Sequence, residues 1–428
     1  MTTAKGYTEM KDSRADWIGK IPATWDVSKI GTLYTQRNEK VSDKDYPPLS
    51  VTMKGILPQL ATAAKTDDGD NRKLVRVGDF AINSRSDRRG SCGISPYDGS
   101  VSLINTILVS RKKMHPGYYD WLFHTTLFAD EFYKWGHGIV DDLWTTRWQE
   151  MKRILVPVPP YETQSAIAAY LDTQCAKIDE SIAQAKASIE DYKQWKASII
   201  YEAVTKGLNP NVEMKDSGIE WIPLLPTAIK VSRVGLHFSI ILGKMLCPEP
   251  LDDTYTLEPY FCAANVHFSG VDSENLKEMW FNPDEKERYR VASGDLLVVE
   301  GGAGAGGCAV IETVDFPIYI QNSIMIVRSK RKNNVKYLKY FLETLVGRGY
   351  IDFACNKATI PHFTKEKLSA VPFPVFDCDT QARIVDFLDS KCGKIDDLIF
   401  QKQSLIDDLE SYKKSLIYEV VTGKRRVI

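Results

Sequence analysis

An internal repeat constrains this chain more than any single motif. Residues 10–13 (Met-Lys-Asp-Ser) return unchanged at 214–217, and residues 198–205 (Ser-Ile-Ile-Tyr-Glu-Ala-Val-Thr) return almost unchanged at 415–422. The copies are 204 residues apart at the first segment and 217 apart at the second, so the second copy carries insertions between them. Ends that match and middles that diverge indicate one scaffold that presents two different surfaces.

Length and composition indicate a soluble protein of more than one domain. A chain of 428 residues exceeds what one hydrophobic core usually holds. No run of about 18 apolar residues is present and the N-terminus has no apolar signal core, so we expect a cytoplasmic protein without a membrane segment. The eight cysteines stand singly and the six histidines are dispersed, which predicts reduced thiols and no metal site.

The order of β-rich and helical segments predicts an α+β fold with two similar heads. Residues 1–160 contain short β-rich runs broken by Gly, Pro and Asp turns, and residues 209–378 read in the same way. Between them, residues 161–208 include a long stretch without Pro or Gly, which is typical of a long helix. Residues 379–428 repeat that helical segment. We therefore predict four segments in the order head, helix, head, helix.

Both helical segments carry an apolar stripe at alternating steps of four and three residues, which is typical of a coiled-coil seam. Each helix would be about 65 Å long at 1.5 Å per residue. If a pseudo-twofold axis relates the two halves of the repeat, the helices run antiparallel and each buries the other's stripe, as in a coiled coil. A surface helix on a globular core is the alternative. The first stripe contains Ile167, Leu171, Gln174, Ile178, Ser181, Ala185, Ser188, Tyr192, Trp195 and Ile199, and the second contains Ile384, Leu388, Lys391, Ile395, Leu398, Lys402, Leu405, Leu409, Tyr412 and Leu416.

A glycine-rich stretch at 301–307 is similar to a nucleotide or S-adenosylmethionine loop. The residues after it, 308–311, read as a strand and not as the helix that such loops require, and no Lys-Ser/Thr follows. The equivalent stretch of the first head, 83–91, is rich in arginine instead. We interpret both stretches as variable hairpin loops, and we predict that this chain binds no cofactor.

Residues 158–161 (Val-Pro-Pro-Tyr) resemble the catalytic tetrapeptide of amino-methyltransferases but lack its leading Asp or Asn. That polar residue accepts a hydrogen bond from the target amino group, so its absence removes the chemistry. No serine-histidine-aspartate set, carboxylate pair or metal cluster stands out by spacing. The sequence therefore predicts a protein that is not itself an enzyme.

The candidate DNA contacts mix donors with aromatic neighbours. Arginine can present two donors to the major-groove edge of guanine, and the alternative for the arginine loop is a solvated turn with ion pairs to Asp79 or Asp87. Residues 145–148 precede the Pro-rich start of the first helix, and residues 357–364 precede that of the second. Both segments have the composition of a reading surface, although many loops share that composition. The predicted contacts are Arg85, Arg88, Arg89, Thr145, Thr146, Arg147, Lys357, Thr359 and His362.

Taken in order, these repeated features resemble the specificity subunits of type I restriction-modification systems. The matching elements are Gly-Asp at 78–79 and 294–295, Pro-x-Pro at 157–159 and 372–374, and a helix that begins near Gln164 and Gln381. The resemblance covers essentially the whole chain. Thr163 and Thr380 stand where that family often has glutamate.

The resemblance implies a function and a set of partners. Residues 1–160 and 209–378 would be two target-recognition domains, each reading half of a bipartite double-stranded DNA target, and 161–208 and 379–428 would be the central and C-terminal conserved helical regions that set the spacer. Two methyltransferase subunits and restriction subunits would be the partners. They would carry S-adenosylmethionine, ATP and magnesium, and they would perform adenine methylation and cleavage.

Two other interpretations stay open. One is a methyltransferase or nuclease in its own right, which the incomplete tetrapeptide opposes. The other is a bivalent scaffold that joins proteins through its coiled coil and does not read DNA. The formal net charge of −1 gives no basic excess, so a DNA-binding chain of this composition needs locally clustered charge or partners that supply it.

Overall fold

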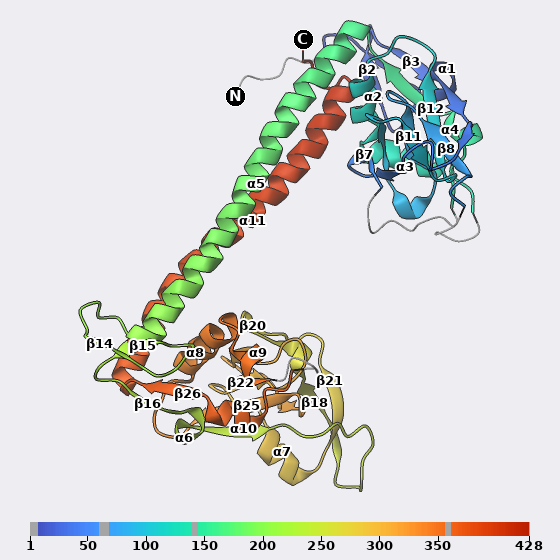
Figure 1. The fold of residues 1–428 in the computed structure, drawn as a ribbon. Helices are drawn as coiled ribbons and strands as arrows, with labels where there is room; N and C mark the ends of the chain where they lie inside the picture. The colour runs from blue at the N-terminus through green and yellow to red at the C-terminus, as the bar shows by residue number, and fades with distance from the viewer. Residues whose placement is uncertain (1–6, 60–67, 139–143, 356–360, 428) are drawn as a thin grey trace. The chain divides into compact units, whose positions relative to one another are not determined.

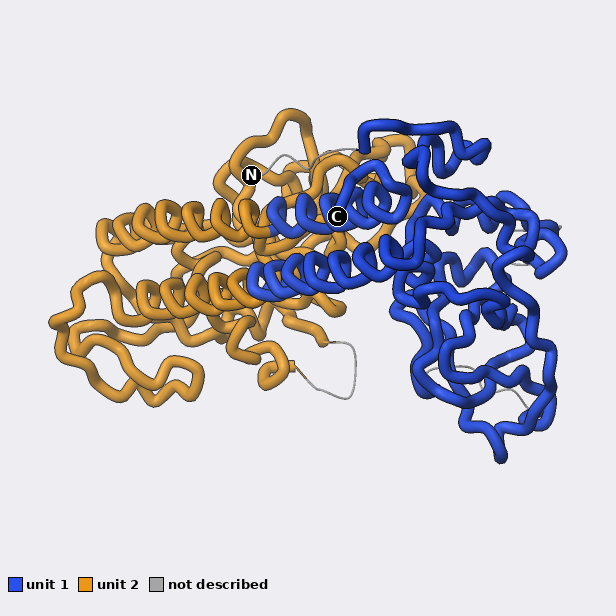
Figure 2. The backbone as a smooth tube through the Cα atoms, turned by 90° about the horizontal axis from the view of Figure 1, so that it is seen from above, with its two compact units in different colours: residues 1–186, 403–428 blue, residues 187–402 orange. Residues whose placement is uncertain are grey.

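The computed structural model describes residues 7–59, 68–138, 144–355 and 361–427. It divides into two compact units, one formed by 1–186 with 403–428 and the other by 187–402 (Figure 2). The division falls inside both long helices, α5 (Tyr161–Lys206) and α11 (Cys378–Val421). Each unit therefore contains one head together with part of each long helix, and each is described below by itself.

The head of the first unit, which carries the labels β12, α2 and α3 in Figure 1, is built around a four-stranded antiparallel sheet. The strand order of this sheet is β10-β9-β12-β4. A three-stranded sheet in the order β11-β8-β5, three two-stranded pairs and short helices complete it. Its strands are β1 (Met10–Asp12), β2 (Lys20–Pro22), β3 (Asp26–Lys29), β4 (Tyr34–Arg37), β5 (Lys40–Val41), β6 (Leu49–Thr52), β7 (Gly55–Pro58), β8 (Arg72–Val75), β9 (Phe80–Asn83), β10 (Cys92–Ile94), β11 (Gly99–Val101), β12 (Asn105–Ser110) and β13 (Leu155–Val158). Its helices are α1 (Ile30–Leu33), η1 (Ser86–Arg88), α2 (Pro116–Phe123), α3 (Thr126–Lys134) and α4 (Trp148–Met151).

The head of the second unit has a four-stranded antiparallel sheet in the order β17-β25-β22-β23. A three-stranded sheet in the order β21-β18-β24 accompanies it, with β18 and β24 parallel. Its strands are β14 (Met214–Asp216), β15 (Leu224–Pro226), β16 (Lys230–Arg233), β17 (Phe238–Leu242), β18 (Thr256–Phe261), β19 (Val266–His267), β20 (Gly270–Val271), β21 (Lys277–Phe281), β22 (Leu296–Val299), β23 (Cys308–Val310), β24 (Tyr319–Ile320), β25 (Ile324–Ser329) and β26 (Pro372–Val375). Its helices are α6 (Val234–His237), η3 (Ala263–Asn265), α7 (Pro283–Tyr289), α8 (Val335–Gly347), α9 (Tyr350–Ala354) and α10 (Lys365–Ala370).

The two four-stranded sheets have the same strand order, with β10, β9, β12 and β4 corresponding to β23, β22, β25 and β17. In each sheet the strand before the variable loop, β9 or β22, lies in the interior of the sheet. β9 and β22 are buried at every residue, as expected of short strands covered on both faces. Each continues into an antiparallel partner, β10 or β23, across the loop interpreted from sequence as a hairpin. The hairpin interpretation of the arginine-rich and glycine-rich loops is thereby confirmed.

The turn before each central strand uses glycine and aspartate in the same way. Gly78 and Gly294 have φ of 87° and 86°, a left-handed conformation that favours glycine. The aspartate that follows accepts a hydrogen bond from the backbone N–H three residues earlier, at 2.8 Å in both heads. Asp79 is ion-paired with Arg37 at 2.9 Å and Asp295 with Arg328 at 2.7 Å. The predicted correspondence of the Gly-Asp segments is confirmed.

A buried glutamine joins each head to the start of its long helix. The Gln164 amide oxygen accepts from the backbone N–H of His115 at 2.8 Å, and its amide nitrogen donates to the carbonyl of Pro159 at 2.8 Å. Gln381 repeats this with Asn334 and Phe376, each at 2.8 Å. Because a buried amide without partners costs free energy, these bonds fix where the helix leaves the head.

The strand pairing corrects one correspondence predicted from the sequence. Pro157 on β13 is paired with Val27, and Pro374 on β26 is paired with Val231. Pro157 therefore corresponds to Pro374, whereas the sequence comparison matched it with Pro372. Both segments contain Pro-x-Pro, and this similarity hid a shift of two residues that the strand register reveals.

In the first unit the two helix segments run antiparallel, and α2 holds one end of the pair. Tyr118 Oη donates to the carbonyl of Val421, at the end of α11, at 2.8 Å, and Trp121 Nε1 donates to Asp172, near the start of α5, at 2.8 Å. Lys413, upstream on α11, is ion-paired at 2.7 Å with Asp179, downstream on α5. From Asp172 to Asp179 α5 runs forward in the sequence, whereas the facing residues of α11 run backward from Val421 to Lys413. The two helices are therefore antiparallel.

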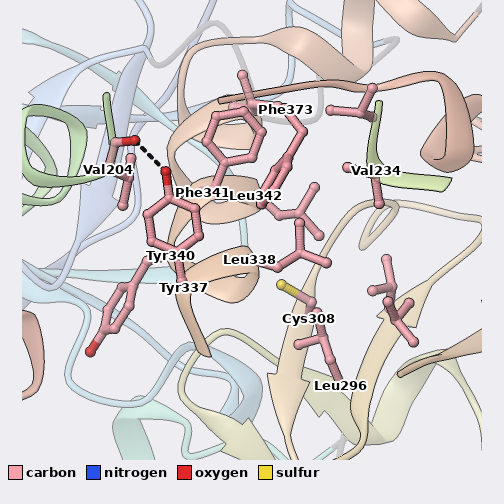
Figure 3. Packing of buried hydrophobic residues seen from close by; sticks show 14 of the residues in the cluster. Val204, Val234, Leu296, Cys308, Tyr337, Leu338, Tyr340, Phe341, Leu342 and Phe373 are labelled. Atoms are coloured by element: carbon pink, nitrogen blue, oxygen red, sulfur yellow. Dashed lines mark hydrogen bonds between the residues drawn. The ribbon is translucent and has the colours of Figure 1, made fainter. Parts of the chain in front are cut away.

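The second unit repeats these contacts through α8. Tyr337 Oη donates to the carbonyl of Val204 at 2.7 Å (Figure 3). Tyr340 Oη donates to Asp389 at 2.6 Å. Lys196 is ion-paired with Asp396 at 2.7 Å. Tyr337 is fully buried, and burial raises its pKa well above the ordinary value. Here too the segments of α5 and α11 are antiparallel (Figure 1).

Burial along the helices supports one half of the predicted stripe and corrects the other. Ile167, Leu171, Ile178, Ile384, Leu388, Ile395 and Leu416 are buried, and Tyr192, Ile199 and Leu409 are half-buried. In the other half of the stripe, the buried residue lies one position later in the sequence than the predicted residue. Cys175 and Ile182 are buried where Gln174 and Ser181 were expected, while Trp195 and Tyr412 are exposed. Burial also raises the pKa of the Cys392 thiol, which takes the place predicted for Lys391, to about 11.

Leu405 is a further residue of the predicted stripe that the structure contradicts. Its side chain is 43% exposed, whereas that of its neighbour Ile406 is 2% exposed. Both residues are aliphatic, so the spacing of apolar residues alone does not distinguish them. The position of the facing helix decides which one is buried.

We expect Ile406→Ala to destabilise the first unit by about 2–4 kcal/mol, because it removes buried methyl groups and leaves a cavity. Leu405→Ala is the matched control and should change stability by less than about 0.5 kcal/mol. Hydrogen exchange of the α11 amides in the full chain measures both effects locally. Equal loss of protection in the two variants would contradict the burial pattern.

Candidate nucleic-acid interface

The loop after each central strand is pinned to the segment that precedes α4 or α10. In the first head, Ser86 N–H donates to the carbonyl of Trp144 at 3.1 Å, and Thr146 N–H donates to that of Ser84 at 3.0 Å. In the second head, Gly302 N–H donates to the carbonyl of Pro361 at 3.1 Å. Arg85 forms an isolated bridge with Thr145, and Gly301 forms one with His362.

This backbone frame makes the two heads comparable residue by residue. Phe363 N–H donates to the carbonyl of Glu300 at 2.6 Å, as Thr146 does to that of Ser84. Ser84 therefore corresponds to Glu300, Arg85 to Gly301, and Thr145 to His362. The same backbone carries different side chains at each position, which is the property expected of a reading surface.

A hollow of about 420 Å³ opens at this frame in the first head. It contains three cationic side chains, several uncharged donors and an indole ring, which suits contact with phosphates and base edges. Its lining residues are Gln36, Lys73, Ser84, Arg85, Leu103, Ile104, Thr106, Thr145, Arg147, Trp148 and Gln149.

The predicted arginine cluster is divided by the fold. Arg85 lies in the hollow and is exposed. Arg88 instead lies 3.6 Å from Asp87, and Arg89 is ion-paired with Asp130 and lies over the ring of Tyr133. The alternative of an ion pair with Asp87 therefore describes Arg88, whereas Asp79 is occupied by Arg37.

Thr146 does not belong to an accessible surface, which corrects its prediction as a DNA contact. Its side chain is 0% exposed, and its hydroxyl donates to the carbonyl of Phe132 at 2.9 Å. The neighbouring residues differ: Arg147 is exposed and Thr145 is half-buried, and both line the hollow. Alternation of side chains along an extended segment accounts for the difference.

In the second head, His362 is exposed, and its Nδ1 lies 3.1 Å from a carboxylate oxygen of Glu300. Lys367 donates to the carbonyl of His362 at 2.7 Å. Lys357 and Thr359, also predicted as contacts, lie outside the described residues.

Several residues at the hollow and the reading surface were not predicted from the sequence. Lys73 reaches the hollow from β8, where its ammonium donates to the carbonyl of Asn105 at 2.6 Å and burial lowers its pKa. Gln36 comes from β4. Glu300 was also missed. Residues on separate strands and helices converge only through the fold, so no spacing rule identifies them.

Two further properties concern only the part of the chain that the structure describes. Within it, no group of three or more His, Cys, Asp or Glu side chains is placed to hold a metal ion. None of the described helices combines the length and the apolar character that a membrane span requires.

Comparison with known proteins gives a family match for part of the second head and part of α11. Residues 269–406 match the family model described as type I restriction modification DNA specificity domain. This segment is similar to type I specificity domains. The resemblance predicted from the sequence is thereby confirmed. A comparison with curated protein sequences gives no match.

Two solved structures share the fold of the whole chain. One is a chain from a structure described as "Structural basis underlying complex assembly and conformational transition of the type I R-M system", with 16% identity and a TM-score of 0.72. The other is the HsdS subunit from Thermoanaerobacter tengcongensis, with 17% identity and a TM-score of 0.56. Each comparison covers 94% of this chain and 98% of the other. These likenesses show that the chain shares the mixed α/β fold of these two structures.

The burial of Thr146 gives a test of the site geometry. Thr146→Val keeps the shape of the side chain but leaves the carbonyl of Phe132 without its donor, so we expect a loss of about 1–3 kcal/mol in the stability of the first head. Arg147→Ala, one residue away and exposed, should change stability by less than about 0.5 kcal/mol. Thermal unfolding of the full chain measures both. A silent Thr146→Val would place that side chain on the surface.

Proposed function

We propose that this chain is the sequence-specific DNA-binding specificity subunit of a type I restriction-modification complex. Residues 1–160 and 209–378 act as its two target-recognition domains, and each reads one half of a bipartite target. The observation that carries the proposal is the shared backbone frame, which presents Arg85 and Thr145 in one head and Gly301 and His362 in the other. One frame with two chemistries suits the reading of two different half-sites.

The helical regions, 161–208 and 379–428, set the number of unspecified base pairs between the half-sites. Their antiparallel packing is fixed within each unit by one lysine-aspartate ion pair and by tyrosine hydroxyls bonded to helix carbonyls. A rigid pair of helices suits this role, because DNA advances about 3.4 Å per base pair and small errors in length would move a head off its bases.

Catalysis belongs to partner subunits in this proposal. Two methyltransferase subunits and the restriction subunits carry S-adenosylmethionine, ATP and magnesium, and the target adenine is flipped into a methyltransferase pocket. Their surfaces also supply the positive charge that a chain with a net charge of −1 lacks. Exposed aromatic side chains on the long helices, such as Trp195 and Phe400, suit contact with such partners.

Methylation mapping of the host genome with and without the gene tests the proposal. We expect the gene's removal to abolish methyladenine at one gapped, bipartite motif while other methylated motifs remain. If the methylome is unchanged although the companion methyltransferase is expressed and active, the bivalent scaffold becomes the better description.

The hollow of the first head gives a residue-level prediction. Arg85→Ala and Arg147→Ala should each weaken binding to the bipartite target by about tenfold or more, since an arginine-guanine pair contributes about 1–3 kcal/mol of discrimination. Arg89→Ala is the matched control and should have a smaller effect, because Arg89 is already engaged by Asp130 and Tyr133. Fluorescence anisotropy of the complex with its methyltransferase subunits measures all three. Equal losses would indicate that the loop contributes only general charge.

A further inference from the structure

The two heads carry chemically different side chains at one shared backbone position, which is Ser84 in the first head and Glu300 in the second. Ser84 is buried, and its hydroxyl lies 3.1 Å from that of Thr106, so it serves the interior of its head. Glu300 occupies the same backbone position but carries a carboxylate at the reading surface. A carboxylate is unexpected there, because it repels DNA phosphates.

Glu300 is held in a fixed place. Its backbone N–H donates to the carbonyl of Ser323 at 2.8 Å, and its own carbonyl accepts from Phe363. Its side chain is 15% exposed, and one carboxylate oxygen lies 3.1 Å from His362 Nδ1. Anchored in this way at both the backbone and the side chain, the carboxylate loses little conformational freedom when it meets a ligand.

The glycine-rich loop explains how DNA can approach that carboxylate. A Cβ atom at Gly301 would lie 3.1 Å from His362 Nδ1, so a side chain there would crowd the imidazole that holds Glu300. Gly302 has a φ of 88°, a conformation that favours glycine. A loop without side chains at these positions leaves part of the Glu300 side chain exposed, whereas the first head places Arg85 at the position of Gly301.

We propose that Glu300, positioned by His362, is a base-reading residue of the second head. It accepts a hydrogen bond from the exocyclic amine of a cytosine or adenine in the major groove. Carboxylates pair with the N4 amine of cytosine in this way, and they are acceptors only, so they cannot bond the O6 and N7 acceptors of guanine. The heads therefore read opposite polarities: Arg85 and Arg147 offer donors, and Glu300 offers an acceptor.

This inference rests on the proposed function, and the sign of one measurement separates it from a simple charge effect. If Glu300 only faces the DNA, Glu300→Ala removes a negative charge and tightens binding to every duplex. If Glu300 reads a base, the same change weakens binding to the target by about tenfold or more. Glu300→Gln keeps an acceptor of similar shape and should recover part of the loss.

The experiment uses the full chain with its methyltransferase subunits and the duplex identified by methylation mapping. At each adenine or cytosine of both half-sites, a base analogue without the exocyclic amine (purine for adenine, 2-pyrimidinone for cytosine) replaces the natural base. We expect the wild-type complex to lose about tenfold or more in affinity at one position of one half-site, and the Glu300→Ala complex to be insensitive at that position. Glu274→Ala removes an exposed acid of the same unit as the matched control and should keep the wild-type sensitivity.

Each outcome has a distinct meaning. Loss of amine sensitivity in Glu300→Ala alone, with unchanged thermal unfolding, supports the assignment. Tighter binding by Glu300→Ala, or equal amine sensitivity in wild type and variant, overturns the assignment and leaves the proposed function standing. A wild-type complex that binds no bipartite duplex overturns the proposed function itself.

Discussion

The two buried glutamines at the starts of the long helices are the contacts on which the rest of the architecture depends. Gln164 and Gln381 each use both ends of the amide, accepting from the segment before α2 or α8 and donating to the carbonyl that closes the Pro-rich strand. A single amide thus joins the start of the long helix to the segment before α2 or α8 and to the residue that follows the Pro-rich strand. Loss of either bond would leave a buried polar group without a partner, so the direction in which the helix leaves the head is strongly specified.

From that junction the same contacts recur in both units, which explains how one scaffold supports two surfaces. Tyrosine hydroxyls on α2 and α8 bond the last turn of the other long helix, and a lysine-aspartate pair fixes the direction of packing further along. The ion pairs are partly exposed, so they contribute modest energy and mainly select the register. These contacts use none of the side chains of the variable hairpin loops, so the loops can change without removing them.

The reading surface has equivalent backbone hydrogen bonds in the two heads but different side chains. Hydrogen bonds of equivalent geometry hold the loop after β9 and the loop after β22. On this frame one head has arginines around a hollow, and the other has a glutamate-histidine pair beside a glycine-rich loop. Two chemistries on one frame are what a protein needs to recognise two unlike half-sites.

The sequence by itself determined the repeat, the two long helices, the hairpin nature of the variable loops and the Gly-Asp turns, because each of these depends on local pattern and backbone conformation. Only the tertiary structure decided which of Leu405 and Ile406 is buried, that Thr146 faces the interior, and that Arg89 is engaged by Asp130. It also brought Glu300 to His362 across 62 residues of chain. Periodicity fixes which residues share a face, but the neighbour that covers the face is a long-range contact, and no local spacing encodes it.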